Sequence, residues 1–135
     1  GLKLSGLASQ IERLVLEAHQ SSPIQYTFQS VDVPDDLPED ITIQIFRITQ
    51  EGIQNIEKHS QARKAEVQLI CHCDQLVLTI DDDGKGFDAT AASPNGIGLE
   101  NIKKRVTYMK GEVMISSVPG SGTEMMVIIP LDGYS

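Results

Sequence analysis

Apolar residues recur along the chain with two different periods, and their order predicts three helices and five strands. Spacings of three and four residues are typical of an amphipathic helix, and alternation is typical of a strand with one buried face. The predicted helices cover residues 7–19, 39–58 and 99–110, and the predicted strands cover residues 25–30, 65–72, 75–82, 112–118 and 123–130. Because helices and strands are mixed without a repeat or a composition break, we expect a single domain over residues 1–135. Its expected fold class is α+β: a two-layer α/β sandwich with a mixed, mostly antiparallel sheet and helices on one face.

Turn-forming residues separate these elements. Asp74 lies in a tight turn between the second and third predicted strands, and Pro119-Gly120-Ser121-Gly122 joins the last two strands. Gly111 stands in the usual position of a glycine just after a helix C-terminus. Residues 84–96 form the long irregular stretch of the sequence.

Polar groups lie beside the apolar stripe of the second predicted helix. At about 100° per residue, Asn55 lies only about 40° from Glu51 and close to the edge of the isoleucine stripe, and His59 follows one turn later. Buried polar groups without partners cost about 1–3 kcal/mol. Two interpretations follow: these side chains bond to a neighbouring loop, or they line a cavity that holds a cation or a polar ligand.

A second unusual position is Asp82. Strand alternation places it on the same side as Leu76, Leu78 and Ile80, whereas Asp81 faces the other side. A carboxylate at the edge of the core can cap the turn at Gly84. Alternatively, it can accept a hydrogen bond from a ligand such as the exocyclic amine of adenine.

Two glycine pairs flank the irregular stretch. Gly84 and Gly86 allow the backbone to approach a flat ring without a Cβ atom between them. Gly96 and Gly98 open the third helix, where unpaired N–H groups favour an anion.

Composition narrows the classes of partner. The formal net charge of −8 argues against binding to nucleic acid or to anionic lipid. No apolar run approaches the roughly 18 residues that span a membrane, so we expect a soluble, cytoplasmic domain. Cys71 and Cys73 are too close on one strand for a disulfide framework, and with His72 they give only a weak zinc signal.

Four segments together resemble the nucleotide-binding boxes of the ATPase superfamily shared by histidine kinases, gyrase-type topoisomerases, Hsp90 and mismatch-repair ATPases. Gln50–His59 resembles the N box, Asp82–Phe87 the first glycine box, Asn95–Asn101 the second glycine box and Gly120–Thr123 the terminal Gly-x-Gly-Thr. The order and spacing of the boxes are also those of the family. The fold that this resemblance implies is the Bergerat-type α/β sandwich.

A finer resemblance is to histidine kinases of the nitrate-sensor and lipid-fluidity-sensor type. It depends on the lead-in Arg47–Glu51, the short lid at about 87–95, the segment from Gly98 to Val106 and the helix–strand preface at 7–30. The resemblance therefore extends over nearly the whole chain.

The resemblance implies roles for individual residues in binding Mg²⁺ and ATP. Asn55 would hold Mg²⁺ against the ATP phosphates, and Lys58 and His59 would neutralise phosphate charge. Asp82 would accept from the adenine amine, with Thr123 helping through a water molecule.

The remaining implied roles concern the glycine boxes and the chemistry. Gly86 would lie beside the base, and Gly96, Gly98 and Leu99 would offer backbone amides to the phosphates. Glu51 would activate the incoming nucleophile.

The implied function is that of the ATP-binding catalytic domain of a two-component sensor histidine kinase. It would transfer the γ-phosphoryl group of ATP to a histidine on a dimerisation domain outside this chain, for relay to a response regulator. The isolated domain would be a monomer, and the full-length protein would be a homodimer that can be membrane-anchored.

Some residues depart from this family pattern. The family's phosphoacceptor helix has no counterpart in the chain, and neither His19 nor His72 lies in a suitable context. The lid lacks the phenylalanine-bearing box of larger sensor kinases. The cluster Lys103-Lys104-Arg105 is interpreted as a solvated helix face in preference to a phosphate clamp.

Two other functions share the same boxes. One is an anti-sigma-factor serine kinase, against which the preface before residue 37 argues. The other is a non-catalytic ATP-sensing module, against which the presence of Asn55, Asp82 and the box glycines argues.

Overall fold

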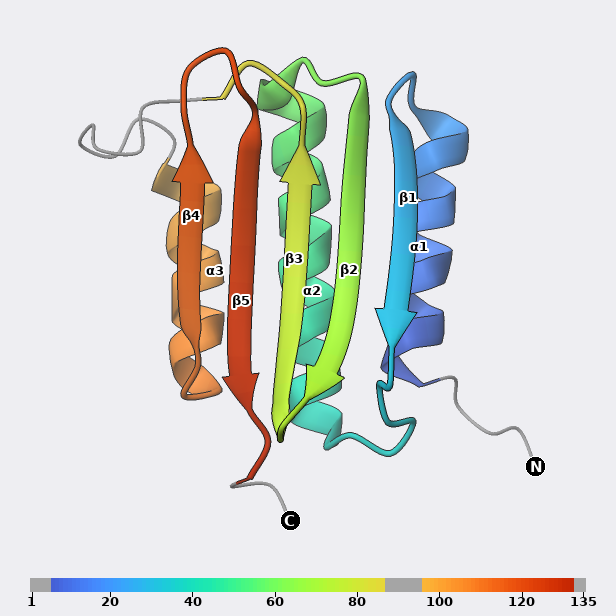
Figure 1. The fold of residues 1–135 in the computed structure, drawn as a ribbon, viewed down its shortest axis with the longest axis vertical. Helices are drawn as coiled ribbons and strands as arrows, with labels where there is room; N and C mark the ends of the chain where they lie inside the picture. The colour runs from blue at the N-terminus through green and yellow to red at the C-terminus, as the bar shows by residue number, and fades with distance from the viewer. Residues whose placement is uncertain (1–5, 87–95, 133–135) are drawn as a thin grey trace.

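The computed structural model describes residues 6–86 and 96–132, which form one five-stranded sheet with helices packed against one of its faces (Figure 1). The elements in chain order are α1 (Leu7–Ser21), β1 (Gln25–Val31), α2 (Glu39–Asn55), the π-helical turn η1 (Ile56–Ser60), β2 (Lys64–His72), β3 (Gln75–Asp82), α3 (Gly96–Tyr108), β4 (Glu112–Ser117) and β5 (Thr123–Pro130). The predicted α+β sandwich with helices on one face is confirmed.

The strand order of the sheet is β1-β2-β3-β5-β4. β1 and β2 are parallel, and the other three neighbouring pairs are antiparallel. A parallel pair needs a long crossover connection, and α2 supplies it between β1 and β2. β5 returns between β3 and β4, so that Asp82 at the end of β3 is paired with Thr123 at the start of β5.

The core lies between the sheet and the helices. Ile41, Ile45 and Ile48 of α2 have no solvent exposure, and neither do Leu76 and Leu78 of β3. Each such side chain contributes about 1.5–3 kcal/mol on burial. The apolar stripe of α2 therefore packs against the apolar face of β3, as the sequence pattern predicts.

The second helix changes its geometry at Asn55, whereas the sequence predicts a continuous helix to Lys58. Residues Ile56–Ser60 form a π-helical turn, and Gln61 ends it with a left-handed φ of 53°. The Ser60 hydroxyl donates to the Ile56 carbonyl at 2.7 Å and accepts from the Ala62 amide at 3.0 Å. These two bonds close the wide turn, and such turns are frequent at functional sites.

The third helix begins at Gly96, three residues before its predicted start, and its end differs from the prediction. The left-handed residue is Lys110, with a φ of 59°, and the Gly111 amide donates to the Val106 carbonyl at 2.9 Å. A Cβ atom on Gly111 would lie 2.5 Å from the Ile128 carbonyl oxygen. Glycine is required there by contact with β5 and not by a left-handed backbone.

The predicted turn around Asp74 is confirmed. Cys73 and Asp74 both have positive φ values, 50° and 59°, as in the two-residue turns that match the twist of a hairpin. Cys71 and Cys73 are free thiols.

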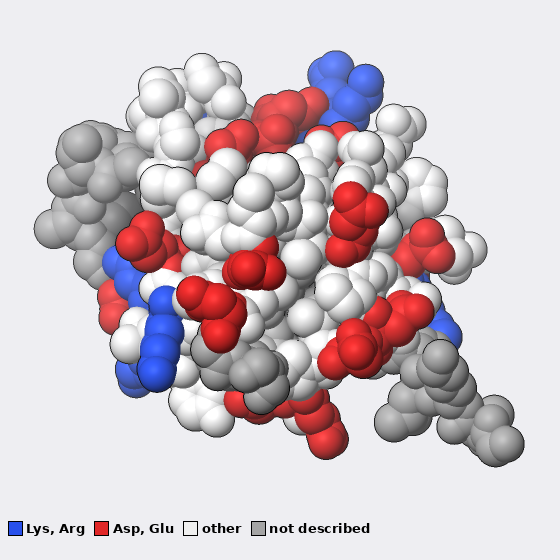
Figure 2. All heavy atoms as spheres, turned by 60° about the horizontal axis from the view of Figure 1, so that its bottom comes forward, with Lys and Arg blue, Asp and Glu red and all other residues white. Residues whose placement is uncertain are grey.

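The described surface is acidic. Acidic side chains are spread over the face in Figure 2, and the basic ones lie toward its edges. Within residues 6–86 and 96–132, no helix combines the length and the apolar character that crossing a bilayer requires.

Candidate functional site

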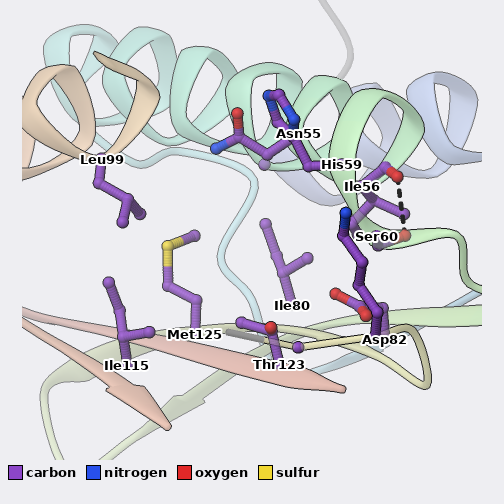
Figure 3. Close-up of a pocket in the computed structure, with 13 residues that line it drawn as sticks. Asn55, Ile56, His59, Ser60, Ile80, Asp82, Leu99, Ile115, Thr123 and Met125 are labelled. Atoms are coloured by element: carbon purple, nitrogen blue, oxygen red, sulfur yellow. Dashed lines mark hydrogen bonds between the residues drawn. The ribbon is translucent and has the colours of Figure 1, made fainter. Parts of the chain in front are cut away.

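A pocket lies between the sheet and the helical layer, at the end of α2 and under η1 (Figure 3). Asn55 and His59 line it from the helical side, and Asp82 and Thr123 line it from the sheet. Asn55 and His59 of the second predicted helix thus line one cavity with the inward carboxylate of β3, whereas Glu51 does not line it.

The remainder of the pocket wall is largely apolar. Ile80, Met125 and Ile115 rise from three adjacent strands, and Leu99 descends from α3 (Figure 3). An apolar slot with a few polar groups is the usual form of a small-molecule site. This slot is suited to a flat, mainly apolar ring.

Asp82 is buried with only 9% of its surface exposed. Its Oδ1 atom accepts from the Gly84 amide at 2.8 Å. Burial raises the pKa of this carboxyl group and the charge of Asp83 raises it further, while the Gly84 hydrogen bond opposes the shift. One oxygen therefore caps the turn, which leaves the second oxygen for a ligand.

Thr123 extends the polar end of the pocket. It is the register partner of Asp82, and its hydroxyl lies 2.8 Å from the Ser117 hydroxyl. Ser117 also donates to the Gly122 carbonyl at 3.0 Å. The start of β5 is thus fixed beside the carboxylate.

The two glycines of the first box have different roles. Gly86 lines the pocket with a left-handed φ of 64°. Gly84 does not line it, and a Cβ atom there would lie 2.2 Å from the Ser60 carbonyl oxygen. Close packing of η1 on this loop, rather than approach to a ring, explains glycine at position 84.

The structure brings together most, but not all, of the residues singled out by the sequence. Those lining the pocket are Asn55, His59, Asp82, Gly86, Leu99 and Thr123. Gly96 and Gly98 belong to the first turn of α3, immediately before Leu99. Glu51 and Lys58 are not among the lining residues, and Lys58 is exposed.

Several lining residues escaped the sequence analysis. Lys85 lies between the two glycines of the first box, and Ile80 is on the inward face of β3 with Asp82. The sequence pattern could therefore have identified both as pocket residues. Ser60, Ile115 and Met125 line the pocket because of the η1 turn and the strand order, which are tertiary features.

The three residues of the basic cluster Lys103-Lys104-Arg105 in α3 differ in exposure. Lys103 and Lys104 are exposed, as predicted for a solvated face. Arg105 is only partly exposed, and its guanidinium group contacts Glu51 and Gln44 of α2, so the prediction is wrong for this residue.

A polar network connects η1 to the first helix and strand. Glu57 Oε2 accepts from the Tyr26 hydroxyl and from the Ser22 hydroxyl, the latter at 2.8 Å. His19 Nδ1 accepts from the Tyr26 amide at 3.1 Å. The turn that follows Asn55 is therefore held from β1.

Replacement of Tyr26 by phenylalanine is expected to lower the free energy of unfolding by about 1 kcal/mol, because one hydrogen bond to a carboxylate is lost. Burial and Glu57 raise the pKa of the Tyr26 hydroxyl. The stabilisation is therefore fully present below the unfolded pKa of about 10 and declines as the pH rises above it. Urea unfolding at pH 7 and pH 10.5 measures both effects. Tyr108→Phe, at an exposed position, is the control and should change neither.

Comparison with known proteins identifies the family to which the chain is similar. The family described as histidine kinase-, DNA gyrase B- and HSP90-like ATPase matches residues 40–133. The signal transduction histidine-protein kinase/phosphatase DegS of Brevibacillus brevis is 31% identical over 126 residues, which cover 93% of this chain and 33% of DegS. Sensor protein VraS of Staphylococcus epidermidis is 35% identical over 132 residues, which cover 98% of this chain and 37% of VraS. The chain thus spans about a third of the length of these relatives.

Solved structures show the same fold. The blue-light activated histidine kinase of Erythrobacter litoralis EL346 superposes with a TM-score of 0.78 at 21% identity, covering 96% of this chain and 43% of that chain. The histidine kinase AdeS of Acinetobacter baumannii superposes with a TM-score of 0.73 at 16% identity, covering 93% of this chain and 64% of that chain.

Proposed function

The chain belongs to the family of histidine kinase-, DNA gyrase B- and HSP90-like ATPases, and from this premise we propose that it is the ATP-binding catalytic domain of a two-component sensor histidine kinase. The observation that carries the proposal is the meeting of Asp82, Thr123, Asn55 and His59 in one cavity with apolar walls. Similarity to DegS, a histidine-protein kinase/phosphatase, and to VraS, a sensor protein, supports the same choice within the family.

The sheet side of the pocket is proposed to bind adenine. The exocyclic amine donates to the free oxygen of Asp82, and a water molecule held by Thr123 completes the polar edge. Ile80 and Met125 offer an apolar surface to the ring, and Gly86 lets the backbone approach it. Gly84 acts indirectly, by fixing the carboxylate that accepts from its amide.

The helical side is proposed to bind the phosphates and Mg²⁺. An amide oxygen such as that of Asn55 is a hard ligand, and Mg²⁺ in nucleotide sites needs only one or two protein ligands besides phosphates and water. When bound, Mg²⁺ would neutralise the charge of the β- and γ-phosphates.

The first turn of α3 supplies the second phosphate contact. Gly96, Gly98 and Leu99 offer backbone amides where the helix dipole favours an anion. His59 of η1 adds a hydrogen-bonding group at the opposite wall, and Lys58, exposed on the same turn, adds positive charge outside the pocket. Positioning and charge neutralisation supply most of the catalysis in phosphoryl transfer.

The phosphoryl group is proposed to pass to a histidine outside residues 1–135, on a dimerisation domain, and then to a response regulator. His19, near the end of α1, and His72, at the end of β2, do not serve, because neither lies in a phosphoacceptor helix with an acidic residue directly after the histidine. We propose further that residues 1–135 are one domain, monomeric by itself and active in the cytoplasm as part of a homodimer.

Titration with ATP and a non-hydrolysable analogue, with and without Mg²⁺, tests the nucleotide site. Incubation with labelled ATP and a phosphoacceptor domain from a DegS or VraS relative tests the transfer, and the product should be acid-labile phosphohistidine. Acid-stable phosphoserine on an antagonist protein would favour the serine kinase instead. Absence of Mg²⁺-dependent ATP binding would overturn the proposal.

Replacement of Asn55 by aspartate is expected to reduce Mg²⁺-ATP turnover about tenfold, because a carboxylate ligand lowers the net positive charge that the bound Mg²⁺ presents to the phosphates. Nucleotide binding measured without Mg²⁺ should change much less. Gln54→Glu, on the exposed side of the same helix turn, adds the same charge as a control. Equal losses in both variants would contradict a specific role for Asn55.

A further inference from the structure

Three polar side chains lie in a row across the sheet at the polar end of the pocket. Asp82 of β3 is the register partner of Thr123 of β5, and Thr123 is in turn the register partner of Ser117 of β4. Register partners point to the same face of a sheet, so all three lie on the inward face. Asp82 and Thr123 line the pocket, whereas Ser117 is buried beside Thr123 and does not line it.

The hydrogen bonds of Ser117 determine where its hydroxyl proton lies. The Ser117 hydroxyl bonds to the Gly122 carbonyl oxygen at 3.0 Å and to Thr123 Oγ1 at 2.8 Å. A carbonyl oxygen can only accept, and a serine hydroxyl has a single proton. The Ser117 proton is therefore donated to Gly122.

The bond between the two hydroxyl groups consequently has one direction. Because Ser117 donates to Gly122, it can only accept from Thr123, and the Thr123 proton points toward β4. The proton is thereby directed away from Asp82, the neighbour of Thr123 on the other side. Thr123 Oγ1 keeps its lone pairs for a group inside the pocket.

The polar end of the pocket thus presents two acceptors side by side. Asp82 Oδ1 accepts from the Gly84 amide at 2.8 Å, which leaves the second carboxylate oxygen for a ligand, and Thr123 Oγ1 is the next acceptor along the row. A ring amine can donate to the carboxylate, and a water molecule can donate both to Thr123 and to the adjacent ring nitrogen. An oxo group in place of the amine would face the carboxylate with no proton between them, which leaves both oxygens unpaired.

We propose that Ser117 is a positioning residue, which holds the Thr123 proton away from the pocket and so makes the site select a 6-aminopurine over a 6-oxopurine. The inference rests on the proposed function, because it concerns the base edge of the same nucleotide site. Ser117 does not line the pocket and acts through Thr123.

ATP and inosine triphosphate distinguish the two kinds of base edge, because they share the ribose and the phosphates and differ only at the purine edge. The wild type should bind ATP about tenfold or more tightly than inosine triphosphate. In Ser117→Ala the Thr123 hydroxyl is free to turn and to donate to Asp82 or to the 6-oxo group. The ratio of the two dissociation constants should therefore fall about three- to tenfold.

A double-mutant cycle separates this role from a structural one. Thr123→Val removes the hydroxyl group and should lower the ratio by itself, and adding Ser117→Ala should then change the ratio no further. Ser116→Ala, at the preceding, exposed position of β4, is the matched control and should keep the wild-type ratio. Isothermal titration gives the dissociation constants, and urea unfolding shows whether each variant is folded under the same conditions.

Several results would overturn the positioning role of Ser117. They are an unchanged ratio in Ser117→Ala, an equal loss of affinity for both nucleotides, a further fall in the double variant, and equal affinity of the wild type for the two nucleotides. If Ser117→Ala does not fold, an unchanged ratio in Thr123→Val would overturn the role as well. Failure of the wild type to bind Mg²⁺-ATP would instead overturn the proposed function, and it is measured independently of any Ser117 variant.

Discussion

Replacement of Asp82 by asparagine is expected to weaken the binding of adenine nucleotides by about 5- to 150-fold, or about 1–3 kcal/mol. The carboxylate lines the pocket, with one oxygen already bonded to the Gly84 amide. An asparagine can keep that bond through its own oxygen, but its amide group then presents donors to the adenine amine. Isothermal titration with ATP and ADP measures the effect.

The same substitution should not destabilise the protein. Burial raises the pKa of Asp82, so the folded state binds its proton more tightly than the unfolded state does. The associated stabilisation is present below the unfolded pKa of about 3.9 and is lost as the pH rises through the folded pKa. At neutral pH the ionised carboxylate therefore costs stability, and Asp82→Asn should unfold at an equal or higher urea concentration than the wild type.

Asp81 provides the matched control, one residue earlier in β3. Its side chain is exposed on the opposite side of the sheet. Partial burial of the carboxyl group and the nearby carboxylate of Glu124 raise its pKa. Asp81→Asn should leave nucleotide affinity unchanged. Equal nucleotide affinity in the wild type and Asp82→Asn would contradict the proposed adenine contact.

The sequence was sufficient for the orientation of Asp82, because strand alternation is a local property. Leu76, Leu78 and Ile80 are buried on the same side of β3 as Asp82, as alternation predicts. The helical stripe of α2 was equally predictable, since Ile41, Ile45 and Ile48 repeat at helical spacing and are all buried. These predictions needed no knowledge of neighbouring elements.

The contacts of Glu51 could not be predicted without knowledge of the neighbouring elements. Helical geometry places Glu51 at the edge of the isoleucine stripe, but that edge can face either a cavity or another helix. In the structure it faces α3, where Arg105 binds it. The η1 turn is likewise outside local prediction, because it depends on the packing of Ser60 against Gly84.

Replacement of Gly122 by alanine is expected to lower the free energy of unfolding by about 2–5 kcal/mol. Gly122 has a left-handed φ of 82°, which costs an alanine about 1–2 kcal/mol. The new Cβ atom would also lie 2.1 Å from the Asp82 carbonyl oxygen. Relief of this contact moves β5 away from β3, at a cost of about 1–3 kcal/mol for overpacking. Urea unfolding measures the total.

Gly120, two residues earlier, separates the two contributions. Its φ is 84°, but a Cβ atom there would meet no heavy atom within 4 Å. Gly120→Ala should therefore cost only the backbone term of about 1–2 kcal/mol. Because the displaced atom in Gly122→Ala belongs to Asp82, that variant should also lose nucleotide affinity, whereas Gly120→Ala should retain it. Equal unfolding energies in the two variants would show that the close approach of β5 to Asp82 carries no energetic weight.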